Sequence, residues 1–275
     1  MRGLVAIFSA VGCLLLICSG SLLAEDLGST APAEQRLEAA EFSPQLGARV
    51  PYQIELIDHD GKQASLAELV AGKPTVLCLV YFRCPMLCEL TADGMVRGLS
   101  ELKRSVGDDF NVLMVSFDPS DTAQRAAAAR EIALKRYSRP GAEAGWFVMT
   151  GKDEAIERLT DAVGFRYYWD KQSRQFAHPA GLVVLTRDGV ISSYLDGVRF
   201  QPKELAAAIE GATEGEVSQQ APSSFLRCYL YDPTTGRFGY AVLWALRIGG
   251  ILTVCGMVVG VTALSMRKAG PSAGE

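Results

Sequence analysis

Strand-like and helix-like segments alternate between about residues 52 and 212, and this alternation constrains the fold more than any other feature of the chain. The apolar runs "KPTVLCLVYF", "FNVLMVSF" and "GWFVMT" are short and rich in β-branched and aromatic residues, which is typical of buried strands. Helix-like segments are expected from about Pro85 to Val106, in "DTAQRAAAAREIALKRY" with Asp121 as its cap, in "DEAIERLTDAVGF" and in "QPKELAAAIEGA". The segment "GLVVLTRDGVISSYL" indicates a hairpin. The pattern predicts an α/β fold in which helices flank a mixed central sheet.

Both ends of the chain are apolar, and they predict an exported protein that is anchored in a membrane. Arg2 is followed by an uncharged stretch that continues to Ala24, as in export signals, whether cleaved or kept as an anchor. The uncharged run Ile248–Met266 is long enough for one membrane crossing. Because Arg267 and Lys268 follow it, the tail should lie in the cytoplasm. We therefore expect the protein in the cell inner membrane, with its soluble domain facing the periplasm.

These features predict a division of the chain into six parts. In order they are a signal peptide or signal anchor at 1–24, a linker at 25–44, an α/β domain at 45–213, a juxtamembrane segment at 214–239, a C-terminal transmembrane helix at 240–266 and a cytoplasmic tail at 267–275. The Lys and Arg residues are dispersed and the formal net charge is -4, so nucleic acid is excluded as a partner.

The cysteines are informative in an exported protein. There are seven in the chain, too few to staple a domain of this size, so a disulfide-rich miniature fold is excluded. Four lie in segments with another explanation, namely Cys13 and Cys18 in the export signal, Cys78 in a strand and Cys255 in the apolar C-terminal run. Three remain, Cys84, Cys88 and Cys228, and the last of these is interpreted as part of a linker.

Cys84 and Cys88 stand where a buried strand is expected to pass into a helix. With Pro85 at the first helical position, the spacing of four residues should place both sulfurs on one face. The positive end of the helix, together with Arg83, favours thiolates. Such a pair suits thiol exchange, metal binding or a structural disulfide, and the spacing alone does not decide between them.

The histidines of the chain favour metal binding over thiol exchange or a structural disulfide as the role of the cysteine pair. The chain has two, and His59 lies in the polar turn "DHDG", whereas His178 precedes a strong strand in "RQFAHPAGLVVL". Two thiolates and one imidazole form a soft set that suits Cu(I), and Cu(II) with a weak extra ligand. Structural zinc prefers a fourth protein ligand, and none is evident. Met86, between the cysteines, is expected to pack rather than to bind metal.

Three motifs, "FRCPMLCEL", "VSFDPSDT" and "FAHPAGLVVLTRDG", together resemble the Sco/SenC family of copper-binding proteins that assist cytochrome c oxidase assembly. The likeness runs from about Gln45 to Gly211. It implies a thioredoxin-like fold for the 45–213 domain, copper as cofactor or cargo, and Cys84, Cys88 and His178 as its ligands. It also implies a copper-receiving partner such as cytochrome c oxidase subunit II, and it places Asp118 in the "DP" segment of the family.

The function predicted is therefore that of a metallochaperone, more a carrier than an enzyme. It would deliver copper to the dinuclear copper centre of the oxidase, or reduce the thiols there. The alternative is a periplasmic thiol-disulfide oxidoreductase that acts on the cysteines of another protein. In that case Cys84 and Cys88 would be redox-active catalytic residues that form a Cys84–Cys88 disulfide.

Overall fold

A five-stranded mixed sheet forms the centre of the computed structural model, which describes residues 40–70, 72–84, 86–171, 174–219, 231–232, 237–238, 247–259 and 261. The strand order is β5-β4-β3-β8-β9. Their bounds are Thr75–Val80 for β3, Asn111–Ser116 for β4, Trp146–Met149 for β5, Gly181–Leu185 for β8 and Ile191–Asp196 for β9. β3, β4 and β5 are parallel, β8 is antiparallel to β3, and β9 is antiparallel to β8. The predicted α/β architecture with a mixed sheet is therefore found.

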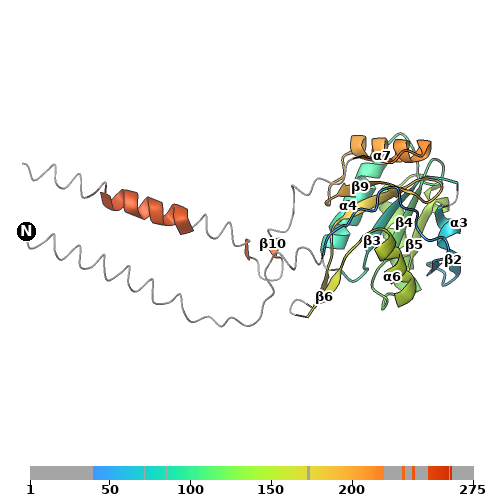
Figure 1. The fold of residues 1–275 in the computed structure, drawn as a ribbon, viewed down its shortest axis with the longest axis horizontal. Coiled ribbons are helices and arrows are strands. Elements are labelled where there is room, and N and C mark those ends of the chain that lie inside the picture. Colours follow the sequence, from blue (N-terminus) through green and yellow to red (C-terminus); the bar gives the residue numbers. More distant parts are fainter. Residues whose placement is uncertain are drawn as a thin grey trace, which may run out of the picture.

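Helices cover the sheet. Their bounds are Leu66–Val70 for α3, Leu87–Ser100 for α4, Ala123–Tyr137 for α5, Asp153–Ala162 for α6 and Pro202–Glu214 for α7, and a short 3-10 helix spans Ala142–Ala144. α4 packs between α5 and α7, while α5 contacts β5 and α7 contacts β8 and β9. Figure 1 shows α7 along the top of the domain and α6 at the bottom, with strands of the sheet between them.

Among the described residues, three two-stranded sheets are separate from the central one. They pair β1 (Glu55–Ile57) with β2 (Gln63–Ser65), β6 (Tyr168–Asp170) with β7 (Gln175–Ala177), and β10 (Tyr231–Asp232) with β11 (Arg237–Phe238). In Figure 1, β6 projects from the opposite side of the domain to β2 and α3. The β6–β7 hairpin was not predicted from the sequence, because strands of three residues are too short to show a period.

Burial explains the apolar runs. All six residues of β3 and all six of β4 are buried, since helices cover both faces of these central strands. The largest fully buried side chains include Trp146, Phe110 and Phe117. On α4, a Cβ at Gly94 would lie 2.0 Å from the carbonyl oxygen of Val198, so this glycine is what lets the helix approach the segment before α7 so closely.

Two predictions about helix ends are wrong. The cap of α5 is Thr122, whose hydroxyl accepts the backbone N–H of Arg125 at 3.4 Å, because the Asp121 carboxylate turns toward another loop. The helix expected to end near Val106 ends at Ser100.

The predicted C-terminal transmembrane helix at 240–266 is also wrong. Over the residues that the structure describes, no helix is both long enough and apolar enough to cross a membrane. Within the described residues, helical backbone is found at 247–259 and again at 261. The expected signal at 1–24 and Cys228 lie outside the described residues.

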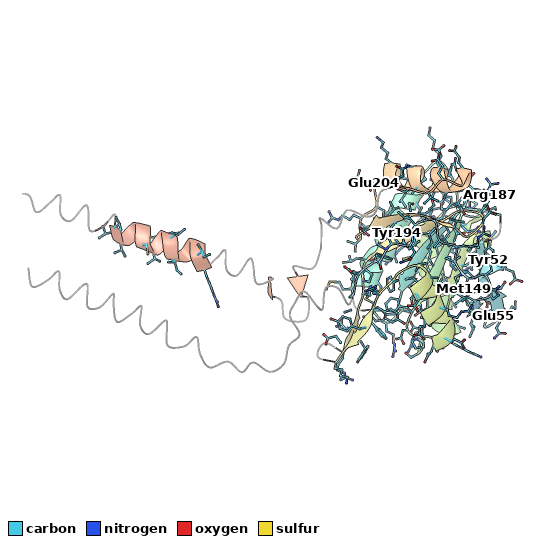
Figure 2. All side chains as sticks on the ribbon, in the orientation of Figure 1. Tyr52, Glu55, Met149, Arg187, Tyr194 and Glu204 are labelled. Carbon is cyan, nitrogen blue, oxygen red and sulfur yellow. The ribbon has the colours of Figure 1, made fainter. Side chains whose placement is uncertain are left out.

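The turn between β8 and β9 lies at one end of the central sheet, and the carboxyl end of β3 lies at the other. Figure 2 shows Tyr52 and Arg187 at the same end of the domain. There the Tyr52 hydroxyl donates a hydrogen bond to the backbone carbonyl of Asp188, in the turn between β8 and β9. Because β8 runs antiparallel to β3, this turn lies at the amino end of β3, and the carboxyl end of β3 faces the other way.

Candidate metal centre

The sheet register brings the cysteine motif and His178 to one place. β3 and β8 pair antiparallel, with Thr75 opposite Leu185 and Leu77 opposite Val183. The residues that follow β3 and the residues that precede β8 therefore leave the sheet at the same end. Cys84 and Cys88 follow β3, and His178 precedes β8, so the three side chains meet there.

The cysteine loop is held by its own backbone. The N–H of Cys84 donates to the carbonyl of Tyr81 at 3.1 Å, and the N–H of Tyr81 donates to Sγ of Cys88 at 3.4 Å. Cys84 lies before the helix, as predicted, although α4 begins at Leu87 and not at Pro85. What joins the two cysteines is the N–H of Cys88, which donates to Sγ of Cys84 at 3.2 Å. This N–H is one of those that a helix start leaves without an intrahelical partner.

His178 completes the group. Its Nε2 lies 3.3 Å from Sγ of Cys88, and its Nδ1 lies 2.8 Å from the carbonyl oxygen of Pro179. A carbonyl can only accept, so Nδ1 carries the proton in this bond, and Nε2 of the neutral ring keeps a lone pair that faces the sulfur. The rings of Tyr81 and Phe117 pack against the imidazole at centroid distances of 5.8 and 5.1 Å. The histidine is thus oriented as a metal ligand would be.

The three ligand atoms of Cys84, Cys88 and His178 all lie within 4.8 Å of one another. Across the described ranges, they form the one group of three or more Cys, His, Asp or Glu side chains close enough to hold a metal ion. His59 instead faces its neighbour Asp60, at 3.9 Å. The set of three predicted from the sequence is therefore the set that the fold assembles.

The two thiols differ in acidity. The Cys88 thiol, with further help from His178 and from the backbone N–H groups of Cys88 and Met86, lowers the pKa of Cys84 well below its usual range, against the opposing effect of burial. Burial, followed by the neighbouring Cys84 thiolate, raises the pKa of Cys88. Cys84 is half-buried and Cys88 is 4% exposed. These opposite shifts favour a thiolate on Cys84, the more accessible sulfur, and a thiol on Cys88, and neither cysteine is in a disulfide.

Arg83 does not act on the cysteines as expected. Its guanidinium bonds Oδ2 of Asp118 at 2.8 Å and also contacts the hydroxyl of Ser120. Burial tends to raise the pKa of Asp118, but hydrogen bonds from Ser120 and Arg83 outweigh it and lower that pKa overall. Asp118 is therefore a loop residue that pairs with the cysteine loop, and it is not part of the ligand group.

A groove lies beside the cysteine motif. It has a volume of about 440 Å³, lies between α4 and α5, and reaches Cys84 and Cys88. Its rim carries Glu89 and Asp93, both paired with Arg136. Met86 has 42% of its surface exposed, so it does not pack as predicted.

Comparison with known proteins identifies the family. The SCO1/SenC family profile matches residues 43–214, which is more than half of the chain. The chain belongs to the SCO1/SenC family. The resemblance found in the sequence motifs is thereby confirmed.

Individual relatives of this SCO1/SenC chain are consistent with the family assignment. Two crystal structures from Aquifex aeolicus VF5, named as a "putative electron transfer protein" and a "putative electron transport protein", are each 30% identical to this chain. They match with TM-scores of 0.55 and 0.52, covering 65% and 62% of this chain and 100% and 99% of their own. These matches support the thioredoxin-like α/β fold. A Stutzerimonas stutzeri protein named "Putative copper-binding protein" is 24% identical over 147 residues, which are 52% of this chain and 67% of the relative.

Proposed function

We propose that this SCO1/SenC protein binds copper through Cys84, Cys88 and His178 and carries it during cytochrome c oxidase assembly. The observation that carries the proposal is the convergence of two sulfurs and one imidazole nitrogen within 4.8 Å. Copper is then the cargo of a metallochaperone, which the protein takes up and hands on.

The donor set favours copper over other metals. Two thiolates satisfy Cu(I), and addition of the imidazole suits Cu(II), whereas structural zinc prefers four protein ligands. No fourth Cys, His, Asp or Glu joins the group within the described residues. The Stutzerimonas stutzeri relative, which is named for copper binding, supports the same choice.

A second function rests on the asymmetry of the two thiols. Cys84 is the more exposed and carries the thiolate, while Cys88 is buried directly behind it. This is the arrangement of an attacking thiol and a resolving thiol, so the chain is also suited to thiol-disulfide exchange with another protein. The Aquifex aeolicus relatives are named for electron transfer and electron transport, and these names support thiol-disulfide exchange as the second candidate function.

The client follows from the chemistry of the site. A soft ion held by three donors, two of them from residues that line a groove, suits transfer to a second thiolate-rich centre, and we propose the dinuclear copper centre of cytochrome c oxidase subunit II as that acceptor. The export-like stretch after Arg2 supports a domain that works at the periplasmic face of the inner membrane.

A metal titration tests the proposal. The reduced chain should bind one equivalent of Cu(I) in competition with a Cu(I) chelator, and Cys84→Ser and Cys88→Ser should each lose this binding. Cys78→Ser is the matched control, because Cys78 is buried in β3 and burial raises its pKa to about 12. Copper binding that survives both site substitutions would contradict the proposal.

A further inference from the structure

The "VSFDPSDT" segment contains a carboxylate that the metal centre does not use as a ligand. The side chain of Asp121 is fully buried, with 0% of its surface exposed. A buried carboxylate is stable only where hydrogen bonds and cations replace water around both of its oxygens. The partners of Asp121 therefore show what it holds in place.

The two oxygens of Asp121 have different partners. Oδ2 accepts the backbone N–H of Phe82 at 2.8 Å and the hydroxyl of Ser116 at 2.6 Å. Oδ1 faces Nη1 of Arg125 at 3.3 Å and Nε of Arg83 at 3.9 Å. Phe82 and Arg83 belong to the loop that carries Cys84, so the carboxylate links that loop to the end of β4.

One peptide group transmits the contact to the metal centre. The N–H that Asp121 holds belongs to Phe82, and the carbonyl of the same peptide unit belongs to Tyr81. That carbonyl accepts the N–H of Cys84 at 3.1 Å. Because a peptide unit is planar and rigid, fixing its N–H also fixes its carbonyl. The N–H of Tyr81, on the other side of the residue, donates to Sγ of Cys88 at 3.4 Å.

We propose that Asp121 is a positioning residue for the metal centre. Through the Tyr81–Phe82 peptide unit it holds the backbone of Cys84 in the orientation that brings both sulfurs to His178. Arg83 and Asp118 close the same loop from its more exposed side, at 2.8 Å. The metal readouts below rest on the proposed copper function, whereas the thiol readout does not.

The test compares Asp121→Ala and Asp121→Asn in the full-length chain. Loss of an outer-shell partner typically weakens metal binding by about 10- to 100-fold, and we expect Asp121→Ala to fall in this range with an altered thiolate-to-Cu(II) absorption. Asp121→Asn keeps an oxygen that can accept from Phe82, so it should recover part of the affinity and most of the spectrum. In copper-free protein, the midpoint of glutathione titration of the Cys84–Cys88 pair should shift in Asp121→Ala.

Thr160→Val is the control for a general loss of stability. Thr160 is buried, and its hydroxyl bonds the carbonyls of Ile156 and Glu157 within α6. The copper affinity, the Cu(II) absorption spectrum and the midpoint of the thiol titration in Thr160→Val should match those of the wild type. An Asp121→Ala protein with wild-type spectrum and thiol midpoint would overturn the proposal, as would equal shifts in Thr160→Val. If the wild type binds no copper, the copper function fails, and the thiol midpoint alone decides the role of Asp121.

A measurement on the wild type covers the case in which Asp121→Ala does not fold. The Phe82 amide should exchange its hydrogen slowly in the native protein, because its N–H is held by a buried carboxylate. Exchange at the rate of an unprotected amide would show that the contact does not hold the loop and would overturn the proposal.

Discussion

Sγ of Cys88 lies 3.3 Å from Nε2 of His178, although 90 positions separate the two residues in the chain. The antiparallel pairing of β3 with β8 makes this possible, since it returns the chain to the carboxyl end of β3 just before β8 begins. The sulfur is buried, and the imidazole is fixed by the Pro179 carbonyl. The contact therefore joins a thiol and a nitrogen lone pair that are both oriented before any metal arrives.

Oxidation of the cysteine pair should block copper uptake. A disulfide between Cys84 and Cys88 occupies both sulfurs, so the oxidised chain should not bind Cu(I) until it is reduced. The measurement is Cu(I) uptake by chelator competition before and after treatment with a reductant that is then removed. Equal uptake by the two forms would place the ligands elsewhere.

Cys84 should react as a thiolate at unusually low pH. Its pKa is lowered, chiefly by the Cys88 thiol, so alkylation by iodoacetamide should persist below the usual thiol range and should fall only as the pH drops through the lowered pKa. The Cys84 thiolate also stabilises the folded state above the unfolded pKa, and this contribution is lost over the same fall in pH. Rates resolved by peptide mass spectrometry would measure the profile.

The same alkylation series has an internal control. Cys78 and Cys88 are buried with raised pKa values, so both should react far more slowly than Cys84 in the native chain. In Cys88→Ala the Cys84 profile should move to higher pH, because the largest cause of its lowered pKa is gone. A Cys84 profile like that of glutathione in the wild type would refute this description of the pair.

Gly94→Ala should destabilise the domain despite a helix propensity gain of about 1 kcal/mol. The added Cβ would lie 2.0 Å from the Val198 carbonyl oxygen, and overpacking of this kind costs about 1–3 kcal/mol. Gly211→Ala is the matched control in α7, because its Cβ would meet Glu216 atoms at 3.5 Å or more. Thermal unfolding should show a lower Tm for Gly94→Ala and an unchanged or higher Tm for Gly211→Ala. The reverse order would mean that α4 does not dock as described.

Export of the domain can be tested with a reporter enzyme that is active only outside the cytoplasm. Fused after Gly211, it should be active, and removal of residues 1–24 should abolish the activity, since the stretch after Arg2 has the features of an export signal. An inactive fusion with the intact N-terminus would place the cysteines in a reducing compartment.

Much of the fold was predictable because it depends on local pattern. The fully buried strands β3 and β4 appear in the sequence as unbroken apolar runs, and the ligand set follows from residue chemistry and motif. The short β6–β7 hairpin and the early end of α4 leave no such pattern.

The role of Asp121 was hidden for a different reason. In the sequence it is a typical helix cap, and only the tertiary structure shows Thr122 in that position and the carboxylate bonded to Phe82. Arg83 likewise looks like a cation beside two thiols, whereas the fold turns it toward Asp118. Long-range polar contacts of this kind depend on the relative placement of two loops, which no local pattern encodes.

The most direct test of the copper account is the response of His178→Ala in the two oxidation states of the metal. Cu(I) is satisfied by the two thiolates, so the variant should retain it, though more weakly, whereas Cu(II) needs the nitrogen, so its thiolate-to-copper absorption should be lost or strongly altered. His59→Ala, which changes a histidine outside the site, should behave as wild type in both states. An unchanged Cu(II) spectrum in His178→Ala would remove the histidine from the site and leave thiol exchange by Cys84 and Cys88 as the better account.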